Sequence, residues 1–128
     1  MPIPSAKVLV VDDHLGFRLA CALLLEGLGH RPHALASVPR ALDAIAAERP
    51  DAVLSDLELP VVDGFHLLAE LRQRGDGVPV VAMSAGHDGV LRRALDLGAV
   101  AALAKPFTPE ELEHALRTAL APRLASAA

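Results

Sequence analysis

The sequence predicts a doubly wound α/β domain in which five parallel strands alternate with five helices. Short apolar runs alternate with longer stretches of helical periodicity along the chain, and the connections between them are short. The first, third and fourth runs are continuously apolar, as expected of strands that helices cover on both faces. This (βα)5 order implies right-handed crossovers and helices on both faces of the sheet.

Five short runs predict the strands. In chain order they are KVLVV, RPHAL, DAVLS, PVVAM and AVAALA, at residues 7–11, 31–35, 51–55, 79–83 and 99–104. Five longer stretches, each bounded by Gly, Pro or a capping residue, predict the helices. They cover residues 14–28, 38–47, 64–74, 89–97 and 109–120.

The composition fits one domain. A chain of 128 residues, 52% of them apolar, has the size and the apolar content for a single core. We expect one domain over residues 1–121 and a short flexible tail over 122–128, where small residues follow Pro122. The net charge is −4 and the 12 Lys and Arg residues are scattered, which argues against direct binding to nucleic acid.

The single cysteine indicates the cellular compartment. Cys21 cannot form an internal disulfide, and no segment has the features of a signal peptide or the length of a membrane span. We therefore expect a cytoplasmic protein that does not contact a membrane. The neighbours of Cys21 are apolar, which favours an inert thiol in the core.

Polar residues follow the predicted strands at their carboxyl ends, where doubly wound sheets bind ligands. Asp12 and Asp13 follow the first strand, Asp56 the third, Ser84 the fourth and Lys105 the fifth. Taken singly, each has a structural interpretation as a helix cap, a turn residue or a solvated charge. Their joint placement favours one functional cleft.

The acidic residues of this cleft need compensation. Carboxylates 4 Å apart repel one another by about 4 kcal/mol per pair at an effective dielectric constant near 20. Lys105 and a divalent cation would supply the opposite charge. A ligand set made only of oxygen atoms favours Mg²⁺, with Mn²⁺ as the alternative.

Four motifs carry a resemblance to a known family: LVVDDH, VLSDLELPVVDGF, VVAMSAG and ALAKPF. With them, residues 7–120 resemble a response-regulator receiver domain of the two-component phosphorelay family. The resemblance implies a flavodoxin-like fold with strand order 2-1-3-4-5. It also implies a signalling module that accepts a phosphoryl group from a sensor histidine kinase or a histidine phosphotransfer protein and then binds a downstream protein differently. Such a module is not an enzyme beyond its own Mg²⁺-dependent phosphorylation and dephosphorylation.

The resemblance assigns the metal ligands by motif position. It makes Asp56 the phosphoacceptor and implies that Asp13, Asp56 and the backbone carbonyl of Glu58 bind Mg²⁺ directly. Asp12 is expected to act chiefly through a coordinated water molecule. No separate general base is needed, because the attacking carboxylate is already ionised at neutral pH.

The resemblance also assigns the groups that contact the phosphoryl oxygens. Lys105 is expected to pair with them, and Ser84 to donate its hydroxyl to one of them. Pro106 occupies the position where the family has a cis peptide bond after the lysine. These roles agree with the chemistry, because phosphoryl transfer needs mainly alignment and neutralisation of the equatorial oxygens.

One position departs from the family, which commonly has an aromatic residue three positions before the lysine. Here that residue is Ala102, and the chain has no Tyr or Trp. We therefore expect the signal to pass through residues 84–89 and the fourth helix. The face formed by the fourth helix, fifth strand and fifth helix is the predicted surface for a partner or a second copy. Leu91, Leu95 and Ala101 are candidates for its apolar part; alternatively, Leu91 and Leu95 pack on the sheet.

The remaining histidines carry no metal motif. His30 and His33 lack the further Cys or His residues that a tetrahedral zinc site requires. His14 and His87 flank the cleft by sequence and are interpreted as solvated loop residues.

Other function classes fit the sequence less well. An enzyme with an aspartyl-phosphate intermediate would carry its nucleophile on the first strand, with a second acid two residues later, which VVDDHL lacks. A flavin-binding protein would need a phosphate-binding loop after the first strand and aromatic rings. A degenerate receiver that acts as a constitutive interaction domain is disfavoured by the intact acids, Ser84 and Lys105. A receiver excised from a hybrid kinase stays open beside the simpler interpretation, a single-domain regulator.

Overall fold

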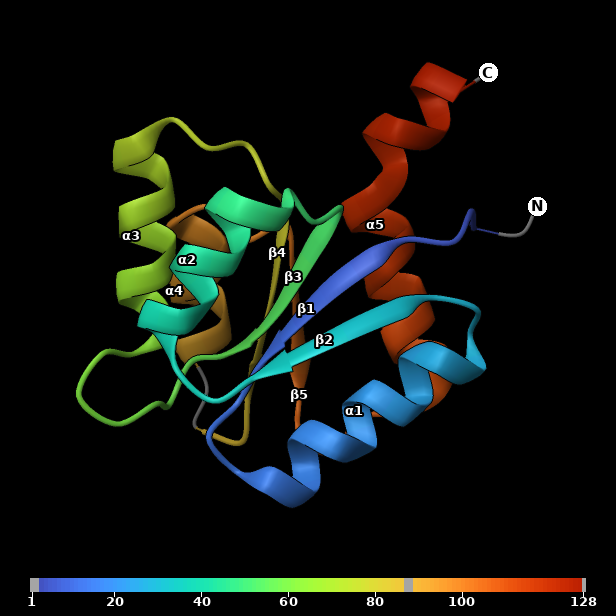
Figure 1. Cartoon of the computed structure of the whole chain (residues 1–128). Helices are drawn as coiled ribbons and strands as arrows, with labels where there is room; N and C mark the ends of the chain where they lie inside the picture. The colour runs from blue at the N-terminus through green and yellow to red at the C-terminus, as the bar shows by residue number, and fades with distance from the viewer. Residues whose placement is uncertain (1–2, 87–88, 128) are drawn as a thin grey trace.

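The computed structural model describes residues 3–86 and 89–127. Its five strands are parallel and form one sheet in the order β2-β1-β3-β4-β5 (Figure 1). The strands are β1 (Lys7–Val11), β2 (Arg31–Leu35), β3 (Ala52–Asp56), β4 (Val80–Ser84) and β5 (Ala101–Ala104). The predicted flavodoxin-like (βα)5 fold and its strand order are therefore confirmed.

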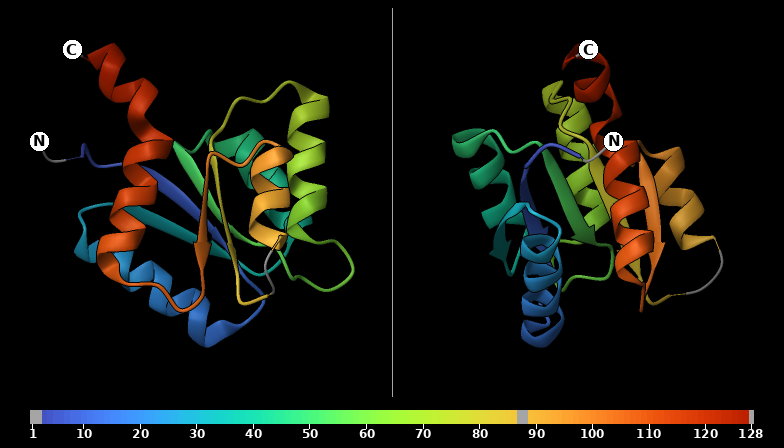
Figure 2. Two further views of the ribbon diagram at one scale, coloured as in Figure 1. Left: turned by 180° about the vertical axis from the view of Figure 1, so that it is seen from behind. Right: turned by 90° about the vertical axis from the view of Figure 1, so that its right-hand side faces the viewer.

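The helices cover both faces of the sheet (Figure 2). On one face lie α1 (Leu15–Gly27) and α5 (Pro109–Ala127), and on the other α2 (Val38–Glu48), α3 (Gly64–Arg74) and α4 (Val90–Asp96). Successive strand residues point to opposite faces of the sheet. Val8 and Val10 of β1 therefore pack in the core beneath α1 and α5, and Leu9 and Val11 pack in the core beneath α2, α3 and α4. The central strands are thus apolar on both sides.

The last helix is longer than predicted. The periodicity predicts an end at Leu120, but α5 continues through Pro122 to Ala127. The added segment contains Ala, Leu and Arg, which favour helix, and Pro122 lies inside it although proline cannot donate a helical hydrogen bond. The length of this helix does not test the domain boundary at residue 121, which stays a prediction.

The fifth strand begins two residues later than predicted because the preceding backbone caps α4. Gly98 has a φ of 114°, and the backbone N–H of Ala99 donates to the carbonyl of Ala94 at 2.9 Å. Gly98 and Ala99 therefore close the helix, and the first backbone hydrogen bond to β4 is donated by Val100, to the carbonyl of Val80 at 2.9 Å. Of the described helices, none has the length and apolar character needed to cross a membrane.

Candidate functional site

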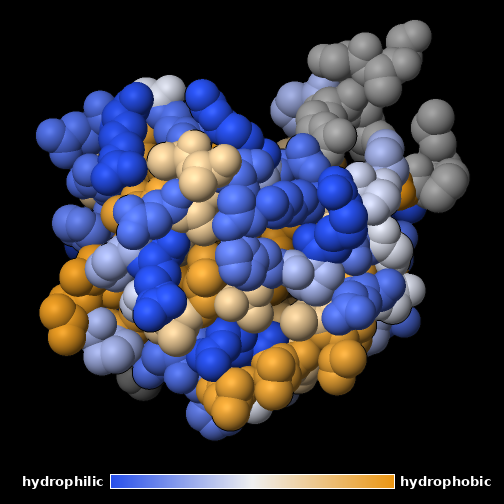
Figure 3. Space-filling view, in the orientation of Figure 1, coloured by the Kyte–Doolittle hydropathy of each residue, from blue (hydrophilic) through white to orange (hydrophobic). Residues whose placement is uncertain are grey.

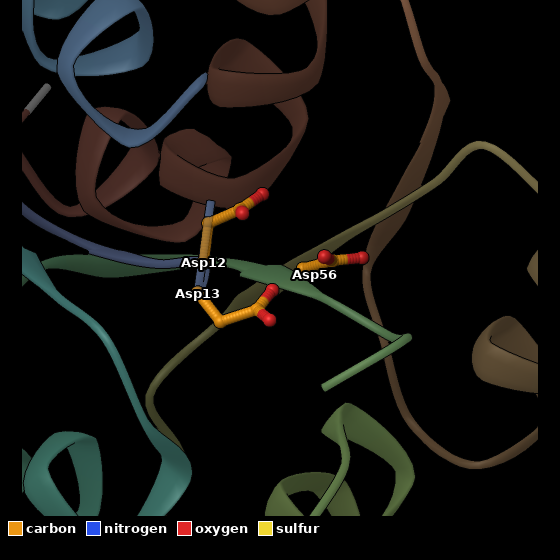
Figure 4. A group of neighbouring side chains, drawn as sticks. All are labelled: Asp12, Asp13 and Asp56. Atoms are coloured by element: carbon orange, nitrogen blue, oxygen red, sulfur yellow. The ribbon is translucent and has the colours of Figure 1, made fainter. Parts of the chain in front are cut away.

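The carboxyl ends of the central strands bring three carboxylates together. Val11 of β1 pairs with Ser55 of β3, so Asp12 and Asp13 leave the sheet beside Asp56, the last residue of β3. One ligand oxygen from each of the three carboxylates lies within 4.8 Å of the others (Figure 4). Asp12 and Asp56 are buried, whereas Asp13 is exposed. The predicted convergence of these acids is confirmed.

Lys105 supplies a positive charge to this cluster. Its Nζ lies 2.7 Å from Oδ2 of Asp12 and 3.1 Å from Oδ2 of Asp56. Burial by itself would lower the pKa of Lys105, but the hydrogen bond to Asp12 and the charge of Asp56 outweigh it and raise the pKa. The ammonium group therefore stays protonated between the two carboxylates at neutral pH.

The environment of Asp56 makes its anion costly. Burial raises the pKa of this carboxyl group above its ordinary value. The backbone N–H of Glu58, which donates to Oδ1 at 3.1 Å, and the charge of Lys105 oppose the rise, whereas Asp12 adds repulsion. A cation bound beside Asp56 would favour its charged form.

The backbone that follows β3 leaves no room for a side chain at Gly64. A Cβ at this position would collide with the backbone oxygen of Asp56 and lie 2.9 Å from Cα of Leu57. Gly64 begins α3, which Asp63 caps by accepting a hydrogen bond from the backbone N–H of His66 at 3.0 Å. Only glycine allows this close approach of the backbone, because it has no Cβ.

Ser84 lies at the end of the neighbouring strand. It follows Met83, which pairs with Asp56 across β3 and β4, and it is buried. The Ser84 hydroxyl donates to Oε1 of Glu58 and accepts from the backbone N–H of Gly86 at 2.8 Å. The structure therefore brings Ser84 to the cleft, where its hydroxyl points to a glutamate that was predicted only as a carbonyl ligand.

The sequence prediction missed three residues beside the cleft. The ring centroid of Phe17 lies 4.3 Å from Nζ of Lys105, and Phe107 packs edge to face against Phe17 at 5.7 Å between centroids. Nη1 of Arg18 donates to the backbone oxygen of Asp12 at 2.8 Å. Phe17 and Arg18 lie in the first turns of α1. Their place near the cleft could have been predicted, because this helix starts close behind Asp12 and Asp13.

The outcome is mixed for the residues expected to carry the signal. The Lys105–Pro106 peptide bond is cis, as predicted. Ala102 and Ala101 are partly buried in β5. Leu91 packs against the core beneath α2, α3 and α4, so the alternative that it packs on the sheet holds for this residue. Leu95, in contrast, is 44% exposed.

The histidines have separate environments. His14 lies next to the cleft, as expected, and caps α1 by accepting the backbone N–H of Phe17 at its Nδ1. His30 is buried, with its Nδ1 accepting a backbone N–H, and His33 lies 3.0 Å from a carboxylate of α2. His87 lies outside the described residues.

The chemistry of the donor set fits a hard divalent cation. Asp12, Asp13 and Asp56 offer only oxygen atoms, and one lysine balances part of their charge. Mg²⁺ prefers such oxygen ligands, keeps several water molecules and shares its coordination shell with phosphoryl oxygens. The acidic cluster is therefore of the type that binds Mg²⁺.

A family model and curated proteins match this chain. The model described as response regulator receiver domain matches residues 8–117. The chain is 32% identical over 114 residues to sporulation initiation phosphotransferase F of Bacillus subtilis, which is 88% of this chain and 92% of that protein. It is 37% identical over 118 residues, 91% of this chain, to response regulator MprA of Mycobacterium tuberculosis, of whose length it spans about half, 51%.

Solved structures match over most of the chain. Chemotaxis protein CheY4 of Vibrio cholerae has a TM-score of 0.83 and 28% identity, with coverage of 91% of this chain and 99% of that chain. The receiver domain of a sensor histidine kinase from Pseudomonas aeruginosa also has a TM-score of 0.83, with 31% identity and coverage of 91% and 98%. That domain was solved with a magnesium ion coordinated in its active site cleft.

Proposed function

Because the chain belongs to the response regulator receiver domain family, we propose that it is a phosphorylation-controlled signalling receiver with Asp56 as its phosphoacceptor. The phosphodonor is a phosphohistidine on a sensor histidine kinase or a histidine phosphotransfer protein. The observation that carries this proposal is the contact of one lysine, Lys105, with both Asp12 and Asp56 inside the acidic cluster.

The reaction is a displacement at phosphorus. An oxygen of Asp56 attacks, a P–O bond forms, and the P–N bond to the donor imidazole breaks. The electron pair of that bond goes to the imidazole nitrogen, which takes up a proton from solvent, and Asp56 becomes an acyl phosphate. Water later hydrolyses the acyl phosphate, which restores the carboxylate and releases inorganic phosphate. The protein needs no further enzymatic activity.

Two side chains are proposed to hold the transferred group. Lys105 already contacts Asp56 and offers its ammonium group to the phosphoryl oxygens. Ser84, which follows the β4 residue that pairs with Asp56, would offer its hydroxyl to another of these oxygens. Lys105 is in position before the reaction begins, whereas the Ser84 hydroxyl has to turn from Glu58 to reach the phosphoryl group.

The acidic cluster would hold Mg²⁺. Asp13, Asp56 and the backbone carbonyl of Glu58 are the proposed direct ligands, and Asp12 is proposed to act through a water molecule. The ion, or Mn²⁺ in its place, would neutralise charge on the phosphoryl group and on the carboxylates. The magnesium ion in the P. aeruginosa receiver domain, at 31% identity, supports the choice of metal.

An apolar stripe on α1 supports docking of a protein phosphodonor. Leu15, Leu19 and Leu23 are 58%, 51% and 69% exposed and are spaced four residues apart, so they share one side of the helix. Apolar side chains line the lower edge of the space-filling view, where α1 lies (Figure 3). Because α1 begins close behind Asp13, a protein whose histidine reaches Asp56 would also cover this stripe.

The β5 edge of the sheet offers a surface for a downstream protein. A groove of about 560 Å³ runs between β5 and α5, and its lining includes Leu95, Val100, Ala102 and Glu111. Leu95 and Val100 are 44% and 40% exposed. We propose that a downstream protein or a second copy of the chain binds this face. The proposal concerns the receiver alone, because the chain spans only about half of relatives such as MprA. Cytoplasmic location stays a prediction.

The test is phosphorylation by a small donor. Acetyl phosphate and Mg²⁺ should add one phosphoryl group to the unaltered chain, measured by mass spectrometry of the intact protein. Asp56→Asn should abolish the addition, whereas Asp43→Asn, at an exposed position of α2, should not change it. A chain that takes up no phosphoryl group would be a constitutive interaction domain, and equal uptake by Asp56→Asn would refute the assignment of the phosphoacceptor.

A further inference from the structure

The side chain of Glu58 makes a contact that the proposed function does not use. The Ser84 hydroxyl donates its hydrogen bond to Oε1 of Glu58, and Oγ of Ser84 itself accepts one from the backbone N–H of Gly86 at 2.8 Å. A serine hydroxyl has one proton to donate. In this structure that proton is committed to the Glu58 carboxylate.

The chain is built to allow this contact. The backbone N–H of Glu58 donates to Oδ1 of Asp56 at 3.1 Å, while its side chain extends from the end of β3 to the end of β4. Gly86 leaves the necessary space, because a Cβ there would lie 3.1 Å from Oε1 of Glu58 and 3.0 Å from Oγ of Ser84. The contact therefore depends on Glu58, Ser84 and the missing side chain at Gly86 together.

The contact competes with the proposed reaction. In the proposed function Ser84 donates its hydroxyl proton to a phosphoryl oxygen on Asp56. The same proton cannot also form a hydrogen bond to Glu58, which lies in a different direction. We propose that Glu58 is a positioning residue that holds the Ser84 hydroxyl away from Asp56 in the unphosphorylated state and releases it on phosphorylation. This inference rests on the proposed function of Asp56 and adds a residue that opposes the phosphorylated state.

Release of Ser84 has a consequence for the backbone. The N–H of Gly86 donates to the same hydroxyl oxygen, so a movement of Ser84 towards Asp56 must either carry Gly86 with it or break that hydrogen bond. Gly86 lies between β4 and α4 in the chain. The Glu58 contact therefore links occupancy of Asp56 to the segment that leads into α4.

A double-mutant cycle tests the competition. The affinity for beryllofluoride, a phosphoryl mimic, is measured by calorimetry at saturating Mg²⁺ for the unaltered chain, Glu58→Ala, Ser84→Ala and the double variant. All four keep the backbone carbonyl of residue 58. Glu58→Ala should bind on the order of tenfold more tightly while Ser84 is present, because a charge-assisted hydrogen bond no longer opposes binding. In the Ser84→Ala background the same change should have little effect.

Three controls sharpen the result. Glu58→Gln should fall between Glu58→Ala and the unaltered chain, since a neutral amide oxygen accepts a weaker hydrogen bond. Asp43→Ala, which removes an exposed carboxylate from α2, should leave the affinity unchanged. In Glu58→Ala without beryllofluoride, the amide resonance of Gly86 should already shift towards its bound position.

Failure of this inference differs from failure of the proposed function. Unchanged affinity in Glu58→Ala, or an equal gain with and without Ser84, would overturn the competition, because charge alone would then explain the effect. If the unaltered chain bound no beryllofluoride and accepted no phosphoryl group at Asp56, the proposed function would fail and this inference with it.

Discussion

Nζ of Lys105 lies 3.1 Å from Oδ2 of Asp56, and the same nitrogen lies 2.7 Å from Oδ2 of Asp12. One lysine therefore offsets part of the negative charge that a metal ion would otherwise have to offset alone. This relationship predicts that the lysine and the metal partly replace one another in stabilising the fold.

The first prediction is that Lys105→Met destabilises the metal-free protein. Methionine keeps the packing on Phe17 but removes the ammonium group, and loss of one partner from a buried ion pair costs about 3 kcal/mol. Urea unfolding should show this loss with EDTA and a smaller one with Mg²⁺. Lys7→Met is the control, because Lys7 pairs with Glu48 at 2.6 Å in a more exposed setting and should respond little to metal. An equal loss with and without Mg²⁺ would contradict the prediction.

The second prediction concerns the metal itself. Mg²⁺ at a hundred times its dissociation constant should stabilise the fold by about 2.7 kcal/mol and raise the melting temperature by several degrees. Asp13→Asn should raise the melting temperature of the metal-free protein, since it relieves repulsion within the cluster, and should reduce the response to Mg²⁺. Differential scanning calorimetry measures both effects. A melting temperature that ignores millimolar Mg²⁺ would argue against a shared metal site.

The fold and the acidic cluster could be predicted because they depend on strong local signals. Continuously apolar strands such as β3 (Ala52–Asp56) indicate burial on both faces. Parallel strands then bring their carboxyl ends to one edge, which places Asp12, Asp56 and Lys105 together without knowledge of any side-chain conformation.

Other features depend on contacts that no pattern specifies. The contact of the Glu58 side chain with Ser84 is helped by the space that Gly86 leaves, and a glutamate two residues after Asp56 has many rotamers. The continuation of α5 through Pro122 was missed because proline normally ends a helix. The exposed stripe on α1 was visible as leucines at a spacing of four, but the same spacing is typical of a buried face.

The third prediction separates input from output. Leu19→Asn, in the middle of the α1 stripe, should slow phosphotransfer from a phosphorylated histidine phosphotransfer protein by on the order of tenfold, because it removes apolar area from the docking surface. The rate with acetyl phosphate should not change, since this small donor needs no docking surface. Leu95→Asn, on the proposed output face, is the matched control and should leave both rates unchanged. If Leu19→Asn slowed both donors equally, α1 would not be the docking surface.

The fourth prediction concerns the reactivity of Cys21. Burial, with a smaller contribution from Asp12, raises the pKa of this thiol from 9.0 to about 12. At pH 8 its thiolate fraction is about a thousandfold lower than that of an unperturbed thiol, so iodoacetamide should label it only after unfolding. Above pH 9 the unfolded thiol ionises first, so the free energy of unfolding should fall as the pH rises, and Cys21→Ala should remove that part of the slope. Rapid labelling of the folded chain would show that the thiol is accessible.

The last prediction is about how phosphorylation reaches the output face. Ala102 leaves no aromatic side chain to rotate, so the signal should travel from Ser84 through Gly86 into α4. That helix spans only Val90–Asp96, and Gly89, with a φ of 95°, begins it without a side-chain cap, so no side-chain capping hydrogen bond has to break when the helix moves. Beryllofluoride with Mg²⁺ should therefore change the amide chemical shifts of Gly86, α4 and β5, while α2 stays unchanged; Asp56→Asn under the same conditions is the control. Shifts confined to residues around the acidic cluster, with α4 and β5 silent, would exclude this route.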